Sequence, residues 1–231
     1  MIRAMIFDIG DTMEPSTALQ KLALQKIQKR YKLPMNFIKT YLKEDAYHEP
    51  HMFHAQGNEK IMRHVVKRMG LSINTQKITR ELKSIFWSEL DNWMKSSNGK
   101  QLKATFDWLK NNGYRVCILS DNSIGAKRKY KMLWRKYGLK YDNFIVSQEV
   151  GWEKPDRRMI EAIPKALGIA NSEAVHFGNN IYRDAACRKW GMPFVLVTGY
   201  LIKYGEMHFN GPKIKYISPN SITAVLSRVI R

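Results

Sequence analysis

Residues 4–12 read Ala4-Met5-Ile6-Phe7-Asp8-Ile9-Gly10-Asp11-Thr12 and carry the strongest structural signal in the chain. The apolar run 4–7 predicts a short buried strand, and Asp8 follows at its carboxyl end. Ligand crevices in open α/β sheets lie outside the carboxyl ends of the strands. A carboxylate there contributes little to packing and is well placed for chemistry, so we interpret Asp8 as a functional residue.

Later parts of the chain repeat this pattern of polar residues after predicted strands or in Gly/Pro-marked loops. From residue 102 onward predicted strands and helices alternate, which is typical of a parallel sheet. They include a single helix over 157–167, a last strand at 216–217 and a final helix over 222–230. The apolar runs 114–119 and 174–177 predict two further buried strands. The polar residues delivered to the strand ends and loops, in chain order, are Ser120, Asp121, Lys154, Asn179 and Asp184.

This ordered set resembles the four motifs of the haloacid dehalogenase-like (HAD) hydrolase superfamily. The resemblance covers nearly the whole chain apart from about eighty residues between the first and second motifs. It implies an α/β fold with a Rossmann-like three-layer core and a parallel sheet. Apolar residues recur at helical spacing in segment 14–96 and predict that it is almost wholly helical. A helical insertion at this position resembles the superfamily's C1 cap. We therefore predict a core domain of residues 1–13 and 97–231 and a helical cap domain of residues 14–96.

The resemblance also implies roles for the site residues. Asp8 would be the nucleophile that forms an aspartyl-phosphate, which water then hydrolyses. Ser120 and Lys154 would act in catalysis by binding the transferring phosphoryl group, with Asp121 in the same phosphate-binding segment. The predicted cofactor is Mg²⁺, a hard cation that takes oxygen ligands. Its ligands would be Asp8, the backbone carbonyl of Gly10, Asn179 and Asp184, and Asp184 could also cap a helix over 185–190.

Two positions depart from the superfamily pattern. Phosphatases of the superfamily usually carry Asp-x-Asp-Gly-Thr, whereas Gly10 stands here in place of the second Asp, the general acid/base. Losing such a group typically costs ~10²–10⁴ in rate. Asp11 is one residue further on, and its side chain is expected to point elsewhere. Asn179 stands where an Asp is usual, and an uncharged ligand should weaken metal binding.

These departures leave three interpretations. The first is a Mg²⁺-dependent phosphatase acting on a small phosphorylated metabolite. The second is a weak or inactive HAD-fold protein that binds an anionic ligand, nucleic acid or a protein partner. The third is a 2-haloacid dehalogenase, since those enzymes also lack the second Asp and need no metal. The arginine and aromatic pocket residues expected for dehalogenation have no clear counterpart near the start of the helical segment.

The chain is strongly basic, with 39 Lys and Arg against 20 Asp and Glu and a formal net charge of +19. A field of this sign concentrates anions such as phosphorylated metabolites and nucleic acid. Segment 127–140 holds seven basic residues and no acid. Its aromatic residues fall at helical spacing, so we predict a buried stripe with a basic solvent face rather than a nucleic-acid stacking surface.

Other sequence features bound the class of protein. No run approaches ~18 apolar residues, so no membrane span is predicted. Cys117 falls in a predicted strand and Cys187 in a predicted helix, so neither suggests a disulfide framework, and their spacing excludes a Cys-based zinc site. We expect a soluble cytoplasmic protein, with an oligomeric state that these features leave open. His48, His51 and His54 recur every third residue, and one of them could replace the missing proton donor from a loop over the site.

Overall fold

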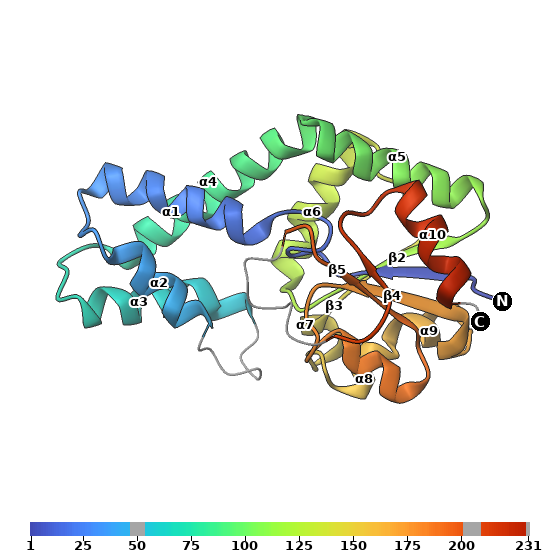
Figure 1. The fold of residues 1–231 in the computed structure, drawn as a ribbon. Helices are drawn as coiled ribbons and strands as arrows, with labels where there is room; N and C mark the ends of the chain where they lie inside the picture. The colour runs from blue at the N-terminus through green and yellow to red at the C-terminus, as the bar shows by residue number, and fades with distance from the viewer. Residues whose placement is uncertain (47–53, 201–208, 230–231) are drawn as a thin grey trace.

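The computed structural model describes residues 1–46, 54–200 and 209–229. Its centre is a parallel sheet in the order β3-β2-β1-β4-β5-β6 (Figure 1). The strands of the described sheet are β1 (Ala4–Phe7), β2 (Arg115–Ser120), β3 (Asn143–Val146), β4 (Ala174–Gly178), β5 (Phe194–Val197) and β6 (Lys213–Ile214). The predicted α/β class with a parallel sheet is therefore confirmed, and β1 lies in the middle of the sheet.

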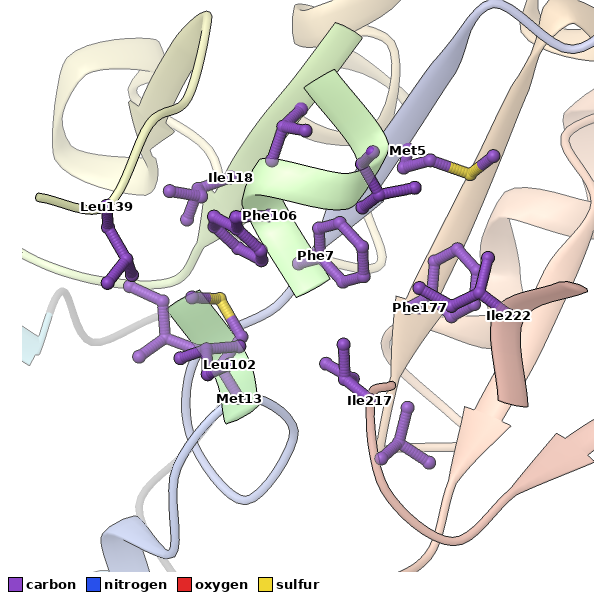
Figure 2. Packing of buried hydrophobic residues seen from close by; sticks show 14 of the residues in the cluster. Met5, Phe7, Met13, Leu102, Phe106, Ile118, Leu139, Phe177, Ile217 and Ile222 are labelled. Carbon is purple, nitrogen blue, oxygen red and sulfur yellow. The ribbon is translucent and has the colours of Figure 1, made fainter. Parts of the chain in front are cut away.

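Helices cover both faces of the sheet. One face packs against α5 (Ser97–Asn111), α6 (Ile124–Tyr137) and α10 (Pro219–Val229). Figure 2 shows this packing, in which Phe7 lies between Phe106 and Phe177 with ring centroids 5.3 and 4.9 Å away. The other face packs against α8 (Arg157–Ile160), α9 (Ala162–Leu167) and the 3₁₀ helix η2 (Ala185–Trp190). Successive strand residues point to opposite faces, so each buried strand serves both layers.

The segment between β1 and α5 is helical throughout its described residues. It contains α1 (Ser16–Tyr31), α2 (Phe37–Ala46), α3 (His54–Arg68) and α4 (Thr75–Lys95). These helices form a lobe to one side of the sheet with a hydrophobic cluster of their own (Figure 1). Ser96 ends α4 and caps α5, and a Cβ on Gly99 would lie 2.5 Å from the Met94 carbonyl oxygen. Only glycine therefore allows this tight passage from the lobe to the sheet.

Several short elements differ from the sequence prediction. The single helix predicted over 157–167 is two short helices, because Pro164 lacks an N–H and its ring clashes with the carbonyl four residues earlier. The last strand is Lys213–Ile214 rather than 216–217, since these two residues pair with the end of β5. The final helix begins at Pro219 instead of Ile222, and proline is favoured at a first helical position. Short α7 (Ser147–Val150) and η1 (Asn171–Glu173) complete the described elements.

The described helices can be compared with the prediction that the chain has no membrane span. Within residues 1–46, 54–200 and 209–229, none of the helices combines the length and apolarity needed to cross a bilayer. The hypothesis about His48, His51 and His54 concerns side chains outside the described part of the chain, so it stays a prediction.

Candidate active site

The predicted site residues meet at the carboxyl edge of the sheet. In the strand register Phe7 aligns with Ile118 of β2 and with Phe177 of β4. Asp8 extends this alignment, because its backbone N–H donates to the Phe177 carbonyl at 2.9 Å. Ser120 ends β2, and Asn179 follows β4 directly. Parallel pairing of the central strands thus brings together residues more than a hundred positions apart.

Lys154 lies at the centre of the cluster. Its Nζ is 2.6 Å from Oδ1 of Asp8 and 2.6 Å from Oδ1 of Asp184, and its side chain is almost fully buried. The loop that carries it is held by a hydrogen bond from the Lys154 backbone N–H to Oδ1 of Asp121 at 2.9 Å. Burial alone would lower the pKa of Lys154, but the carboxylates of Asp184 and Asp8 raise it above its usual value. Lys154 is therefore a cation at neutral pH.

The two carboxylates that share Lys154 differ in pKa. Burial raises the pKa of Asp8 to about 7, with Lys154 opposing and Asp184 and Asp121 adding to the shift. For Asp184, burial also acts upward, but Lys154 and then His176 hold its pKa below the usual range. Asp184 Oδ2 in addition accepts the Asn180 backbone N–H at 2.9 Å. Asp184 is thus the fixed anion of the pair, and Asp8 is the more easily protonated one.

Thr12 joins two of the predicted metal ligands. Its Oγ1 is 3.4 Å from Oδ2 of Asp8 and 3.4 Å from Oδ1 of Asn179. The Thr12 hydroxyl is therefore within reach of one oxygen from each of these two residues. Among the described residues, no group of three or more His, Cys, Asp or Glu has the arrangement of a metal site. A Mg²⁺ ion here would need the Asn179 amide and a backbone carbonyl in addition to carboxylates, and such an all-oxygen set suits a hard cation.

Two glycines of the site differ in what they allow. A Cβ on Gly178 would lie 2.5 Å from the Asp184 carboxyl carbon, so Asp184 reaches its position only because residue 178 lacks a side chain. A Cβ on Gly10 would meet nothing closer than Ser16 Oγ at 3.4 Å. The position after Ile9 therefore has room for a Cβ, with which the side chain that superfamily phosphatases usually carry would begin.

Asp11 does not take the place of that acid. It has a positive φ of 53°, and its Oδ1 accepts the Thr17 backbone N–H at 3.0 Å. Its other oxygen accepts the Thr17 hydroxyl. The carboxylate is therefore committed to the first turn of α1, in agreement with the expectation that it points elsewhere.

Ser120 and Asp121 lie beside Lys154 in different ways. Ser120 is 3% exposed, lines the cavity above Asp8, and its Oγ accepts a hydrogen bond from the Asn122 amide at 3.2 Å. The Asp121 carboxylate holds the Lys154 backbone and an ion pair with Arg183 at 2.8 Å. The Asp121 carboxylate thus positions the loop that carries Lys154. If Asp121 contacts phosphate, the contact would come from its backbone N–H. Asp184 occupies the N-cap of η2, but its side chain makes no capping bond.

Several residues near the site were not predicted from the sequence. His176 lies within β4 with Nε2 3.3 Å from Asp184 Oδ1, and burial lowers its pKa. Arg183 pairs with Asp121 and Glu153 and donates to the Lys154 carbonyl. A histidine inside an apolar strand is the signal that could have identified His176. Arg183 has no such signal, because its partners come from two other loops.

A further buried acid lies next to the Asp8 turn. Glu14 is 1% exposed, and its Oε1 accepts hydrogen bonds from the Tyr130 hydroxyl at 2.6 Å and the Ser16 hydroxyl at 2.9 Å. Burial raises the pKa of Glu14 to about 7, although both hydrogen bonds act to lower it. This contact ties the start of α1 to α6.

The site opens into a cavity of about 710 Å³. Strand-end loops supply its polar floor, and α4 and α6 supply a second wall. The lining residues of that wall are Leu82, Lys83, Phe86, Trp87, Lys129 and Tyr130. A volume of this size fits a small-molecule ligand.

Known proteins resemble the chain over nearly its full length. A family model described as haloacid dehalogenase-like hydrolase matches residues 5–197. A protein of Methanothermobacter thermautotrophicus named glyceraldehyde 3-phosphate phosphatase is 25% identical over 222 residues, covering 90% of this chain and 91% of that protein. The magnesium-bound HAD-hydrolase YfnB of Bacillus subtilis superposes with a TM-score of 0.74 at 16% identity, covering 98% and 99% of the two chains. The L-2-haloacid dehalogenase of Xanthobacter autotrophicus superposes with a TM-score of 0.68 at 12% identity, covering 97% and 98%.

Proposed function

Because the chain belongs to the haloacid dehalogenase-like hydrolase family, we propose that it is a phosphatase of small phosphorylated metabolites that acts through an aspartyl-phosphate at Asp8. The observation that carries the proposal is the contact of Lys154 with Asp8 at the floor of the cavity. The Lys154 ammonium favours the ionised form of the Asp8 carboxyl group and holds it in position through Oδ1. The relative named glyceraldehyde 3-phosphate phosphatase supports a phosphorylated substrate.

We assign each residue of the site a separate role in phosphoryl transfer. The Asp8 carboxylate attacks phosphorus and displaces the leaving-group oxygen, while the Lys154 ammonium and Ser120 hydroxyl bind the phosphoryl oxygens on which negative charge accumulates. Positioned charge of this kind supplies most of the catalysis in phosphoryl transfer. A Mg²⁺ ion, held by Asp8, Asn179, Asp184 and the Gly10 carbonyl, would neutralise phosphoryl charge. The magnesium bound to the Bacillus subtilis neighbour supports this choice of cofactor.

We assign the leaving group a decisive part in the rate. With glycine at position 10, no carboxylic acid stands beside the scissile oxygen to protonate it. Substrates whose leaving group needs no proton, such as acyl phosphates, should therefore react faster than alkyl or aryl esters.

Residues 14–96 serve in this proposal as a cap over the core formed by 1–13 and 97–231. The cavity supports the division, because α4 lines one wall while the strand-end loops line the floor. The cap would select the substrate through the side chains of that wall.

A second candidate function is hydrolytic dehalogenation of a 2-haloacid. Gly10 favours it, because a halide leaves without a proton and the second Asp is then unnecessary. The proposal is tested against it by measuring halide release from L-2-chloropropionate alongside phosphate release.

The test of the phosphatase proposal is hydrolysis of acetyl phosphate and p-nitrophenyl phosphate with and without Mg²⁺. We expect metal-dependent turnover, faster with acetyl phosphate, and a loss of at least about 10³-fold in Asp8→Asn. Asp11→Asn is the matched control, since it removes an adjacent carboxylate that points away from the cavity. Turnover that survives in Asp8→Asn would refute the aspartyl-phosphate, and chloride release without phosphate release would favour dehalogenation.

A further inference from the structure

Two lysines on the α4–α6 wall of the cavity form no ion pair within the described part of the chain. Lys83 is half-buried and Lys129 is exposed, and both line the cavity. Among the described residues neither forms an ion pair, whereas Lys154 and Arg183 on the floor are each held by carboxylates. The cavity-lining carboxylates all belong to the floor: Asp8, Asp121 and Asp184. The wall therefore carries positive charge that none of the described carboxylates neutralises through an ion pair.

The two lysines line the same wall of the cavity as Trp87. Lys83 and Trp87 are four residues apart on α4 and so lie on one side of that helix. Lys129 Nζ is 5.5 Å from the Trp87 ring centroid, and the Trp87 ring meets Tyr130 edge-on at 4.8 Å. Two ammonium groups that line one wall of a cavity repel each other, and an anion bound by both offsets that repulsion.

We propose that the substrate carries a second anionic group, a carboxylate or a second phosphate, which Lys83 and Lys129 bind while Asp8 receives the phosphoryl group. The inference rests on the proposed phosphatase function and specifies its substrate class. The bonds to the second anion are charge-assisted and therefore among the stronger ones a ligand can make.

The size and lining of the cavity agree with such a substrate. A volume of about 710 Å³ holds much more than a phosphoryl group, so a carbon chain fits between the floor and the wall. Leu82, Phe86 and Trp87 give that chain an apolar surface on α4. A substrate of this class has an anion at each end and carbon between them.

The test uses pairs of phosphate esters that differ in a second anion. The pairs are 3-phosphoglycerate with glycerol 3-phosphate, 6-phosphogluconate with glucose 6-phosphate, and fructose 1,6-bisphosphate with fructose 6-phosphate. Calorimetric titration of the Asp8→Asn protein measures binding, and phosphate release by the unsubstituted protein measures kcat/KM. We expect the doubly anionic member of at least one pair to be preferred by about tenfold to a hundredfold in both measurements. The first two pairs report a carboxylate and the third reports a second phosphate.

The double variant Lys83→Met with Lys129→Met should bring that preference close to one. The control is Lys77→Met with Lys131→Met, which removes the same charge from exposed positions on the same helices outside the cavity. Because the readout is a ratio between two ligands, partial loss of folded protein does not affect it. Equal preference in the two double variants would overturn the proposal, as would the absence of preference or of binding in all three pairs.

The two proposals fail in distinguishable ways. Preferential binding of the double anion without phosphate release leaves the second-anion site standing and refutes the phosphatase function. Phosphate release with no preference within any pair supports the phosphatase function and refutes the second-anion site.

Discussion

Lys154 determines how the two nearest carboxylates of the site behave. It contacts Asp8 and Asp184 equally closely, yet the pKa of Asp8 is raised to about 7 while that of Asp184 is lowered. The difference comes from the other neighbours, since Asp184 also has His176 and a backbone N–H. A nucleophile should be the less stabilised anion, and this asymmetry agrees with the role proposed for Asp8.

Substituting Gly10 should restore the missing proton donor. A Cβ at this position meets only Ser16, at 3.4 Å, and Gly10 lines the cavity, so we expect Gly10→Asp to be accommodated. We expect its kcat for an alkyl ester such as glycerol 3-phosphate, whose leaving group needs a proton, to rise by ~10²–10⁴. The rise should be smaller for acetyl phosphate, which gains only from activation of water in the second step.

Gly10→Asn is the matched control for that experiment. It has nearly the same volume and cannot donate a carboxyl proton, so it should leave the two substrates in their original ratio. An equal gain in both variants would contradict the explanation.

The close approach of Asp184 to Gly178 leads to a second prediction. Gly178→Ala would place a Cβ 2.5 Å from the Asp184 carboxyl group and force that side chain off Lys154. We expect a loss of at least about tenfold in turnover and about 1–3 kcal/mol in the free energy of unfolding, measured by urea titration. Gly125→Ala, whose Cβ would make an ordinary 3.7 Å contact, should not lower the free energy of unfolding.

At the scale of elements, the turn after β1 joins the strand, the helical lobe and α6. Glu14 makes this junction by accepting hydrogen bonds from Tyr130 of α6 and from Ser16 at the start of α1. Its own carboxyl group is buried away from water. The junction is therefore sensitive to the ionisation of a single acid.

The pH dependence of stability should reveal that acid. Burial raises the pKa of Glu14 from 4.5 to about 7, so its stabilising protonated form is fully present below pH 4.5 and is lost as pH rises through 7. We expect Glu14→Gln to gain stability relative to the unsubstituted protein across this window, by about 3 kcal/mol in total. Urea unfolding at pH 4.5, 6 and 8 measures the difference.

Tyr130→Phe provides a companion variant. Because the Tyr130 hydroxyl donates to Glu14 and lowers its pKa, removing it should extend the loss of stability to higher pH. Parallel pH profiles for the unsubstituted protein and Glu14→Gln would show that Glu14 ionises normally.

At the scale of the whole molecule, the net charge of +19 surrounds a site whose floor is rich in carboxylates. The positive field attracts anions toward the protein. The carboxylates on the cavity floor can instead bind a cation, such as a metal ion, beside the phosphoryl group. The charge of the whole protein is therefore positive, whereas the charge of the carboxylates on the cavity floor is negative. The first acts on a substrate at long range, and the second acts only inside the cavity.

Salt should separate these two effects experimentally. We expect kcat/KM for a dianionic phosphate ester to fall steadily as KCl rises from 10 to 300 mM, because the screening length falls from about 30 Å to below 10 Å. The value of kcat at saturation should change little, since bound substrate no longer depends on steering. A kcat/KM independent of salt would mean that the surface charge serves another purpose.

Much of the fold was predictable because its signals are local. Short apolar runs ending in polar residues predicted β1, β2 and β4, and helical spacing predicted the insertion after β1. The short pairings were not predictable: residues 213–214 become a strand only because β5 offers them an edge. The 3₁₀ form of η2 and the break at Glu161 likewise depend on local sterics that a periodicity does not show.

The sequence alone was enough for the α/β class, for the family resemblance and for the set of polar residues after the central strands, because each depends on neighbours within a few positions. The tertiary structure was needed for everything that depends on distance in space. It places Thr12 and His176 beside the predicted ligands, buries Glu14 under Tyr130, and aligns Lys83 with Lys129 along one wall of the cavity. Parallel strand pairing and helix packing make these contacts between residues far apart in the chain, and no local pattern records which distant side chains will meet.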